Sequence, residues 1–551
     1  MSIALLESWH YNATKLLYST PGYHYSLIAR APHDLNIVPP DAWPGNAERG
    51  ATILNGEFSF FGESVRGGLL TWRPSEMSNA WLAELHGFDW LRDLRALGGD
   101  GPRRKARALV EDWLLKQSSW HDIAWRPDVI GSRLYSWLGQ HDFFCASADD
   151  EYQHNYLVSL VRQAKHLSRA LPHGVNRDDM ILATKGLLAA GLSISGHESW
   201  VSQGLKLLER ACTKQILADG GHISRNPTTQ AHVLRHLVDI RSSLLAAQRE
   251  VPGFLIAAIE STAPFLRMLR HNDGGPALFN GAKETPGWLI DMLLVQANSR
   301  GRAPTSAPHS GFERIVANRT TIIMDTGSPS DNKSHASTLA IEMSNGRERI
   351  IVNCGARAGA SASWSQVQRS TAAHSTMVVD DTNSSDILNG KKYSRRPSKV
   401  VIDRKETNGN VWISSSHDGY VPILGVTHQR RLYVDKSGDD VRGEDTVFLD
   451  GYGKRQPRGY AIRFHLHPSV QVSLVQNGNT ALLRPPSGIG WRLIAEGGIL
   501  SLSESIYLGS NDEIRRSEQI VVSGVFDPPD KNGAISRVVW ALKKVPKKTL
   551  I

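Results

Sequence analysis

Two runs of helical periodicity are separated by the polar stretch Leu217-Ala-Asp-Gly-Gly-His-Ile-Ser-Arg-Asn-Pro-Thr-Thr-Gln230. In the run before it, apolar residues recur at helical spacing from Val201 to Ile216, which predicts a helix with one apolar face. The Asp-Gly-Gly sequence that begins at Asp219 is typical of a helix end followed by a turn. The stretch therefore predicts a tight connection between two amphipathic helices.

The same stretch gathers three side chains that bind or move charge. His222, Arg225 and Asn226 supply an imidazole, a guanidinium and an amide within five residues. Binding and catalytic groups concentrate on loops held by a rigid scaffold, so we interpret the stretch as a candidate site. An ordinary helix connection is the alternative, with Asp219 as a turn residue and Arg225 in a surface ion pair.

A second copy of the turn follows 54 residues later. It reads Arg270-His-Asn-Asp-Gly-Gly-Pro-Ala-Leu-Phe-Asn-Gly281 and also follows an amphipathic run, from Phe254 to Leu269. Two such loops at a regular interval predict an array of helical hairpins with its functional loops on one face. Asp219 and Asp273 are then equivalent candidates for contact with a substrate.

The length of 551 residues predicts two or more domains. Residues 1–100 are rich in Trp, Pro and Gly, and we expect an irregular segment whose Trp residues mostly pack rather than stack on sugar rings. Residues 101–305 are expected to pair their helices and to curl into a solenoid or a closed (α/α) toroid. Helices are predicted at 106–114, 128–144, 152–171, 180–195, 199–217, 228–248, 253–270 and 286–297.

The hydrophobic period changes from 3.6 to 2 after a linker rich in Pro, Gly and Ser at 299–311. We therefore expect an antiparallel β-sandwich over residues 312–551. Asn345-Gly346 and Asn477-Gly478 predict hairpin turns. Strands are predicted at 314–324, 339–343, 349–352, 400–402, 411–413 and 481–484.

The charge and composition of the chain limit the classes of molecule that it is expected to bind. The formal charge is +9, and the pI near 9.3 favours an anionic partner such as an acidic polysaccharide. The basic residues are scattered and carry no nucleic-acid-binding signature, so we expect no nucleic acid partner. No apolar run reaches the length of a membrane span.

The expected compartment is the cytoplasm. The N-terminus lacks the features of a secretory signal, although a trimmed chain would leave the periplasm or secretion open. The three cysteines, Cys145, Cys212 and Cys354, are too far apart to suggest a disulfide framework, which fits a reducing compartment. The sequence leaves open whether the chain forms a homo-oligomer.

Seven short motifs follow one another along nearly the whole chain. They are His86-Gly-Phe-Asp-Trp-Leu-Arg-Asp-Leu94, Gly174-Val-Asn-Arg177, Asp219-Gly-Gly-His-Ile-Ser-Arg-Asn-Pro227, Val352-Asn-Cys-Gly355, Ser370-Thr-Ala-Ala-His-Ser-Thr376, Ser416-His-Asp-Gly-Tyr420 and Arg463-Phe-His-Leu-His467. In this order they resemble the heparinase II/III-like superfamily of polysaccharide lyases. That resemblance implies a toroid followed by a β-sandwich, and β-elimination on a uronate-containing glycan.

The resemblance also implies roles for particular residues. Asn176 matches the family's carboxylate-binding Asn, and Arg177 stands beside it where a cation could grip the same carboxylate. His374 matches a His that acts as base or orienting group, and Tyr420 matches a Tyr that acts as acid or base. The alternatives are that Asn176 is a helix N-cap, that His374 is a buried structural residue and that Tyr420 is a core aromatic residue.

The chain departs from the family pattern after Pro227. Characterised members carry a catalytic Tyr two positions beyond this Pro, often followed by His, whereas this chain has Thr229 and Gln230. His222 or His232 could take over that role.

No diffusible cofactor is expected. Some members of the family hold a structural zinc in the sandwich through two His and an Asp. His465 and His417 are the candidate ligands here, and a zinc site stays open.

Two other functions remain as alternatives. A glycoside hydrolase needs two carboxyl groups in one cleft, and Asp219 with Asp273 would supply them, with Glu284 or Asp178 nearby in the sequence. A non-catalytic protein that binds acidic glycans would retain the cleft without the proton-transfer residues. Release of an unsaturated uronate distinguishes a lyase from both.

Overall fold

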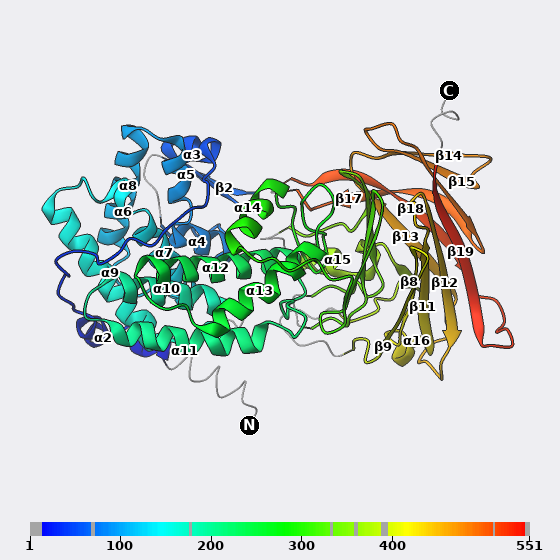
Figure 1. The fold of residues 1–551 in the computed structure, drawn as a ribbon, viewed down its shortest axis with the longest axis horizontal. Coiled ribbons are helices and arrows are strands. Elements are labelled where there is room, and N and C mark those ends of the chain that lie inside the picture. The colour runs from blue at the N-terminus through cyan, green and yellow to red at the C-terminus, as the bar shows by residue number, and fades with distance from the viewer. Residues whose placement is uncertain are drawn as a thin grey trace. The chain divides into compact units, whose positions relative to one another are not determined.

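The computed structural model describes residues 14–67, 72–175, 179–330, 334–357, 362–386, 395–510 and 513–545. The chain divides into two compact units (Figure 1). Unit 1 comprises residues 1–215 and 233–259, and unit 2 comprises residues 216–232 and 260–551. The first Asp-Gly-Gly loop thus belongs to the unit that contains the two large β-sheets.

Helices make up most of unit 1, together with one β-hairpin formed by β1 (Glu57–Phe60) and β2 (Glu63–Arg66). The helices that lie wholly in unit 1 are α2 (Pro21–Ser26), α3 (Ala47–Leu54), α4 (Asn79–Gly87), α5 (Leu91–Leu97), α6 (Asp100–Lys116), α7 (Pro127–Gly139), α8 (His141–Phe144), α9 (Asp150–Ala170), α10 (Met180–Ser193) and α11 (Glu198–Gln215). Helices α12 (Pro227–Ala246) and α13 (Gly253–Met268) each contribute residues to both units.

Local sequence explains how these helices begin and pack. The Asp149 side chain accepts a hydrogen bond from the Tyr152 backbone N–H and starts α9. Helix α10 packs against α7, α9 and α11. Where α7 and α10 meet, a Cβ on Gly186 would lie 2.4 Å from the Cα of Gly131, so this close approach requires glycine.

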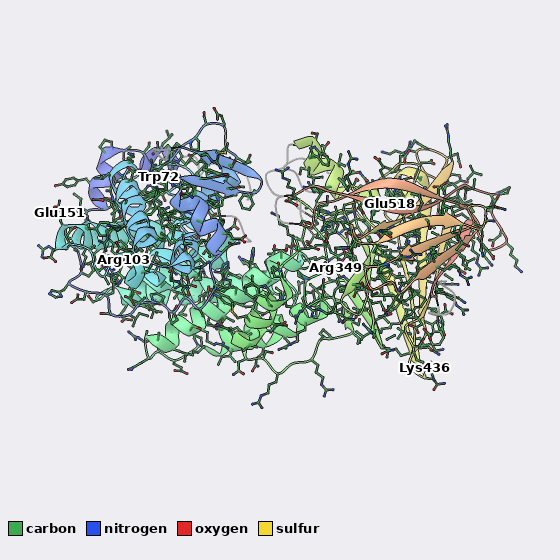
Figure 2. All side chains as sticks on the ribbon, turned by 90° about the horizontal axis from the view of Figure 1, so that it is seen from above. Trp72, Arg103, Glu151, Arg349, Lys436 and Glu518 are labelled. Carbon is green, nitrogen blue, oxygen red and sulfur yellow. The ribbon has the colours of Figure 1, made fainter. Side chains whose placement is uncertain are left out.

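Aromatic residues fill the core of unit 1. Trp113 and Trp137 meet edge to face with ring centroids 5.3 Å apart. The prediction that most of the N-terminal tryptophans are packing residues is therefore confirmed. The buried set includes Trp72, Trp81, Trp90, Trp113, Trp125 and Trp137 (Trp72 is labelled in Figure 2).

Unit 2 contains two large antiparallel sheets. One runs in the order β14-β15-β16-β19-β12-β11-β10-β9, and the other in the order β17-β18-β13-β7-β6-β5-β4-β3, with β8 paired to β13. The strands of the first are β9 (Val400–Thr407), β10 (Asn410–His417), β11 (Val426–Val434), β12 (Asp440–Leu449), β14 (Gln471–Val475), β15 (Thr480–Arg484), β16 (Trp491–Glu496) and β19 (Ala534–Lys544). Those of the second are β3 (Ser306–Ala307), β4 (Phe312–Ala317), β5 (Thr320–Asp325), β6 (Ile341–Asn345), β7 (Glu348–Val352), β8 (Met377–Val379), β13 (Gly459–Leu466), β17 (Ile499–Tyr507) and β18 (Arg515–Val525).

Aliphatic side chains from both sheets meet in one core cluster, which includes Ile322 and Met343 from one sheet and Ile413 and Leu432 from the other. The short helices of unit 2 are α14 (Gly287–Ala297), α15 (Ala362–Arg369), η2 (Thr371–Ala373) and α16 (Val421–Leu424). Within the described ranges, no helix combines the length and the apolar character that crossing a membrane requires.

Two sequence predictions need correction. The run 314–324 is not one strand but the hairpin β4–β5, because Asn318 adopts a left-handed conformation with φ +49° and turns the chain. The run 128–144 divides into α7 and α8 at Gln140. The hairpin turns predicted at Asn345-Gly346 and Asn477-Gly478 are confirmed.

Candidate active site

The first Asp-Gly-Gly loop is held in unit 2 by its aspartate. Asp219 accepts hydrogen bonds from the backbone N–H (2.7 Å) and the hydroxyl (2.6 Å) of Ser310. Gly220 has a φ of +85°, and a Cβ there would lie 2.1 Å from the carbonyl oxygen of Ser261. Both carboxylate oxygens of Asp219 are therefore engaged in fixing the loop.

Arg225 lies inside unit 2 and ties the same loop to the sheet. Its guanidinium pairs with the buried carboxylate of Asp325 and donates to the carbonyl oxygens of Ser310 (2.6 Å) and Gly311 (3.1 Å). It also lies over the ring of Phe312, with 5.0 Å to the ring centroid. Its contacts in this structure are thus with the protein's own carboxylate, carbonyls and aromatic ring.

His222 and Gln230 close the turn from within. The His222 backbone N–H donates to the Gln230 side-chain oxygen at 2.7 Å, and its Nδ1 pairs with the Ser224 hydroxyl at 2.8 Å. The Gln230 amide donates to the carbonyl oxygens of Gly220 (3.0 Å) and Thr262 (3.1 Å). Gln230, one of the two residues that depart from the family pattern, therefore binds the backbone of its own loop.

The second loop has a different set of anchors. Asp273 pairs with Arg349 of β7 at 2.8 Å and accepts the Gly275 backbone N–H at 2.8 Å (Arg349 is labelled in Figure 2). Next to it, Nε2 of His271 lies 2.9 Å from the fully buried carboxylate of Glu342. Asp273, like Asp219, is engaged in holding its loop.

Two asparagines, also 54 residues apart, join the loops to each other. The Asn226 amide donates to the Asn280 carbonyl at 2.8 Å, and the Asn280 amide donates to the Arg225 carbonyl at 3.1 Å. The Asn226 side-chain oxygen also accepts the backbone N–H groups of Thr228 and Thr229 and so caps α12. The internal repeat in the sequence thus corresponds to two loops that bind each other reciprocally.

A pair of histidines lies beside this junction. The Asn280 side-chain oxygen accepts the His335 backbone N–H at 3.2 Å. Nδ1 of His335 lies 3.1 Å from Nε2 of His374, whose own Nδ1 lies 2.7 Å from the Ser370 carbonyl. His335 and His374 are 2% and 1% exposed. Segments before β6 and before β8 therefore bring two imidazoles together at the second loop.

The hydrogen-bond partners assign the tautomers of this pair. A carbonyl only accepts, so Nδ1 of His374 carries the proton and its Nε2 is an acceptor. Nδ1 of His335 must then be the donor between the rings, which leaves the free lone pair on Nε2 of His335. No described residue donates a hydrogen bond to that atom, so within the described part of the chain the series of bonds ends there.

The surroundings keep both rings neutral. Burial lowers the pKa of His374 to about 4, although its bond to the Ser370 carbonyl acts in the opposite direction. Burial also lowers the pKa of His335 well below its usual value, and His374 and Arg369 add to this effect. A neutral imidazole is the form that accepts a proton.

Glycine leaves Nε2 of His335 uncovered by a side chain from the second loop. A Cβ on Gly281, where φ is +82°, would lie 3.1 Å from that nitrogen and 3.6 Å from the Asn226 amide nitrogen. Nε2 of His335 therefore lies close to the backbone of the second loop and to the Asn226 amide of the first.

Tyr420 lies elsewhere in unit 2. Its ring is fully buried in the core between the two sheets, and its hydroxyl donates to the Met377 carbonyl at 2.9 Å. Burial raises the pKa of this hydroxyl. The structure does not bring Tyr420 to the two loops.

The two histidines considered as zinc ligands lie in different sheets, His417 in β10 and His465 in β13. Nε2 of His465 lies 2.9 Å from the Ala372 carbonyl and Nδ1 lies 2.8 Å from the Ser505 hydroxyl, so neither nitrogen has a free lone pair. In the part of the chain that the structure describes, no three His, Cys, Asp or Glu side chains are grouped to hold a metal ion. These residues do not fit a zinc site.

Asn176 and Arg177 lie outside the described residues, so their predicted role stays a prediction. Sequence reasoning missed His335 and Asn280. Asn280 is in the second copy of the loop, at the position equivalent to Asn226, and aligning the two copies would have found it. His335 lies in the polar segment between β5 and β6 and carries no local signal for its partner 39 residues later.

Two models of known protein families together match most of the chain. Residues 57–286 match the family described as "Heparinase II/III N-terminus", and residues 299–536 match "Heparinase II/III-like, C-terminal". A relative from Caulobacter vibrioides (strain NA1000 / CB15N), named FtsZ-localized protein C, is 29% identical over 535 residues. That match covers 93% of this chain and 91% of the relative.

Solved structures agree on the fold. A crystal structure of heparinase III superposes with a TM-score of 0.72 at 13% identity and covers 97% of this chain and 92% of its own. Heparan sulfate lyase HepC from Pedobacter heparinus gives a TM-score of 0.60 at 16% identity and covers 95% and 87%. The predicted fold class, an (α/α) toroid followed by an antiparallel β-sandwich, is confirmed.

Proposed function

Because the chain belongs to the heparinase II/III-like family, we propose that it is a polysaccharide lyase that cleaves a uronate-containing, anionic glycan by β-elimination. The observation that carries the proposal is the bonded chain Ser370–His374–His335, which ends in one free imidazole lone pair. The net charge of +9 supports an anionic substrate. No diffusible cofactor takes part in this reaction.

β-Elimination requires a base at C5 of the uronate and neutralisation of the adjacent carboxylate. We assign the base to Nε2 of His335, since the other three ring nitrogens of the pair are engaged in hydrogen bonds. His374 positions His335, because its Nε2 accepts the Nδ1 proton of His335. Arg369, close enough to lower the pKa of His335, is the nearby cation proposed to favour the carboxylate.

The proton transfers of the proposed reaction can be completed without a Tyr at position 229, where this chain has Thr229. The C5–H bond breaks as His335 takes the proton, a C4–C5 double bond forms, and the C4–O bond breaks. The His335 imidazolium then returns the proton to the departing oxygen. One residue can therefore serve as base and acid, which accommodates the departure from the family pattern.

The test is turnover of a panel of acidic glycans, followed by the ultraviolet absorbance of the unsaturated uronate together with reducing ends. His335→Ala should lower kcat by about 10²–10⁴-fold, because it removes general acid–base catalysis. His374→Ala should lower kcat less, since His335 keeps its free nitrogen. His154→Ala, at an exposed position on α9, is the control and should leave kcat unchanged.

The pH profile tests the same assignment independently. Because burial lowers the pKa of His335 well below its usual value, kcat/KM should stay level from pH 8 through the usual His pKa of about 6.5 and fall only in more acidic solution. A decline centred at the usual His pKa of about 6.5 would assign the base to another, exposed imidazole. Lyase activity that survives in His335→Ala would remove His335 from the mechanism and leave the reaction class intact.

A second candidate function is glycan binding without turnover. It is favoured by Thr229 in the place of the family's Tyr, and by a relative that is named for its localisation rather than for a reaction. Binding of an acidic glycan with neither absorbance nor new reducing ends would support it. New reducing ends without absorbance would instead indicate a hydrolase, for which Asp219 and Asp273 would first have to leave Ser310 and Arg349.

A further inference from the structure

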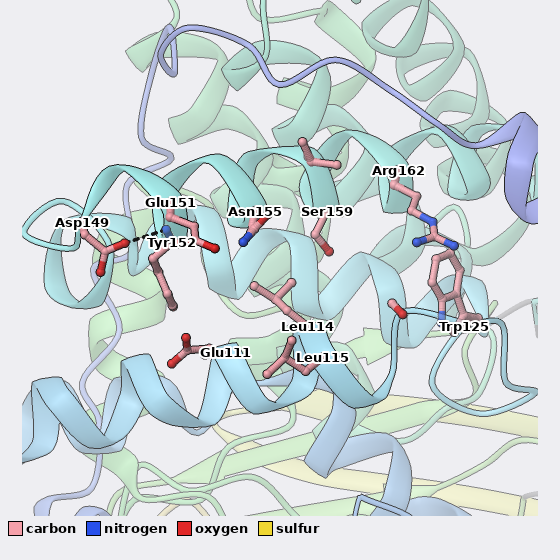
Figure 3. Close-up of a pocket in the computed structure, with 12 residues that line it drawn as sticks. Glu111, Leu114, Leu115, Trp125, Asp149, Glu151, Tyr152, Asn155, Ser159 and Arg162 are labelled. Atoms are coloured by element: carbon pink, nitrogen blue, oxygen red, sulfur yellow. Dashed lines mark hydrogen bonds between the residues drawn. The ribbon is translucent and has the colours of Figure 1, made fainter.

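Unit 1 carries a groove that the proposed reaction does not use. A hollow of about 480 Å³ lies between α6 and α9, with side chains from both helices facing it (Figure 3). A second hollow, of about 610 Å³, is lined partly by the same residues, Ser118, Val158 and Arg162. The two hollows therefore adjoin each other, and together they are called here the α6–α9 groove.

Large apolar side chains are exposed along the α6–α9 groove. Leu115 is 76% exposed beside the first hollow, and Tyr25 and Ile28 are 77% and 63% exposed beside the second. Soluble proteins rarely leave several such side chains together in water unless a partner covers them. The groove thus has the apolar component of a docking surface.

The two ends of the α6–α9 groove carry side chains of opposite charge. Glu111, Asp149 and Glu151 lie at one end, and Arg162 lies at the other (Figure 3). Arg162 lies eleven positions after Glu151 on α9, which corresponds to about 16 Å along the helix. Among the described residues, neither Glu111 nor Glu151 forms an ion pair, and Glu151 lies at the periphery of unit 1 (Figure 2).

The cation at the other end is incompletely paired. Arg162 contacts Nδ1 of His24 at 3.2 Å and lies over the ring of Trp125, while its buried Nε has no hydrogen-bond partner among the described residues. Burial lowers the pKa of its guanidinium, so an anion beside it would relieve a desolvation cost. The groove therefore offers carboxylates to a cation at one end and a guanidinium to an anion at the other.

We infer that the α6–α9 groove binds an amphipathic helix of a partner protein, with basic residues against Glu111 and Glu151, apolar residues on Leu115, and an acidic residue toward Arg162. Two helices form its walls and their backbone groups are already paired, so the occupant is held by side chains, as in helix-in-groove recognition. Three carboxylates at one end disfavour an acidic glycan or an anionic membrane. The helix runs antiparallel to α9 if its basic residues lie in its last turn, which also suits its dipole.

The probe is a synthetic helical peptide of about sixteen residues, with two glutamates in its first turn, a leucine stripe at helical spacing and two lysines in its last turn. Fluorescence anisotropy with the full chain should show saturable binding. The double variant Glu111→Lys, Glu151→Lys should bind about tenfold more weakly. A second peptide, with glutamates in place of both lysines, should recover that affinity on the double variant.

Leu115→Glu should abolish binding of the first peptide, whereas Leu245→Glu, at an exposed leucine on α12, is the matched control and should bind as the unmodified chain does. Circular dichroism of each variant checks that the helices are retained. The charge-swap recovery would not survive a mere folding defect.

Three results would overturn the inference: no saturable binding by either peptide, binding that ignores both the charge reversal and Leu115→Glu, or preferential binding of vesicles that contain anionic lipid. A change of oligomeric state in Leu115→Glu, without peptide binding, would assign the groove to a second copy of the chain. None of these results depends on lyase activity.

Discussion

The two Asp-Gly-Gly loops of unit 2 share a backbone but differ in what holds them. In the first, Gly220 N–H donates to the Leu217 carbonyl at 2.9 Å; in the second, Gly274 N–H donates to the His271 carbonyl at 3.0 Å. The φ angles of the two glycines are +85° and +89°. The same three-residue sequence therefore produces the same turn in both places.

The anchors of the two loops have diverged. The first loop binds through Asp219 to a neutral serine and through Arg225 to the buried Asp325, whereas the second binds through Asp273 to Arg349. Asp325 is fully buried, while the Asp273 side chain is 30% exposed. The same local turn can thus be anchored by different long-range hydrogen bonds and ion pairs. We expect the more deeply buried ion pair to contribute more to the free energy of unfolding.

The largest expected difference between the loops is in these ion pairs. Asp325→Ala should destabilise unit 2 by about 3–5 kcal/mol, because it leaves the Arg225 guanidinium buried without its carboxylate. Asp273→Ala should cost less, about 1–3 kcal/mol, because the carboxylate that is lost is 30% exposed and water can take its place beside the buried Arg349 guanidinium. Differential scanning calorimetry of both variants measures the two losses, and equal losses would refute the role of burial.

Replacing the glycines of the two loops, Gly220 and Gly274, should give a smaller difference in stability. Alanine in a left-handed conformation costs about 1–2 kcal/mol at either position. Gly220→Ala should cost more than Gly274→Ala, because its Cβ would lie 2.1 Å from the Ser261 carbonyl, whereas the nearest atoms at position 274 are 2.9 Å away. Melting temperatures compare the two variants, and a lower value for Gly274→Ala would contradict the closer contact at Gly220.

The asparagines that join the loops should differ least. Asn280→Ala leaves the buried Arg225 carbonyl and the His335 N–H unpaired, at an expected cost of about 2 kcal/mol. Asn226→Ala removes the cap of α12 and should cost about 1 kcal/mol. The double variant tests the coupling: losses that simply add would show that the two asparagines act independently.

Sequence patterns predicted the repeat, the change from helices to strands and the two Asn-Gly hairpins, because each depends on neighbouring residues. The same reasoning missed the turn at Asn318, which lies inside an apolar run and lacks a following glycine. At the candidate site it singled out His374, but not the His335 that contacts it, and it interpreted Arg225 as a substrate ligand without any sign of Asp325.

The sequence by itself determined where the chain turns, since φ preferences and hydrophobic period are properties of adjacent residues. Only the tertiary structure decided which side chains meet: Arg225 with Asp325, Asn226 with Asn280, and His335 with His374. These partners are 39 to 100 residues apart. Their pairing, their burial and the low pKa of His374 arise from packing between elements, which no short stretch of the sequence encodes.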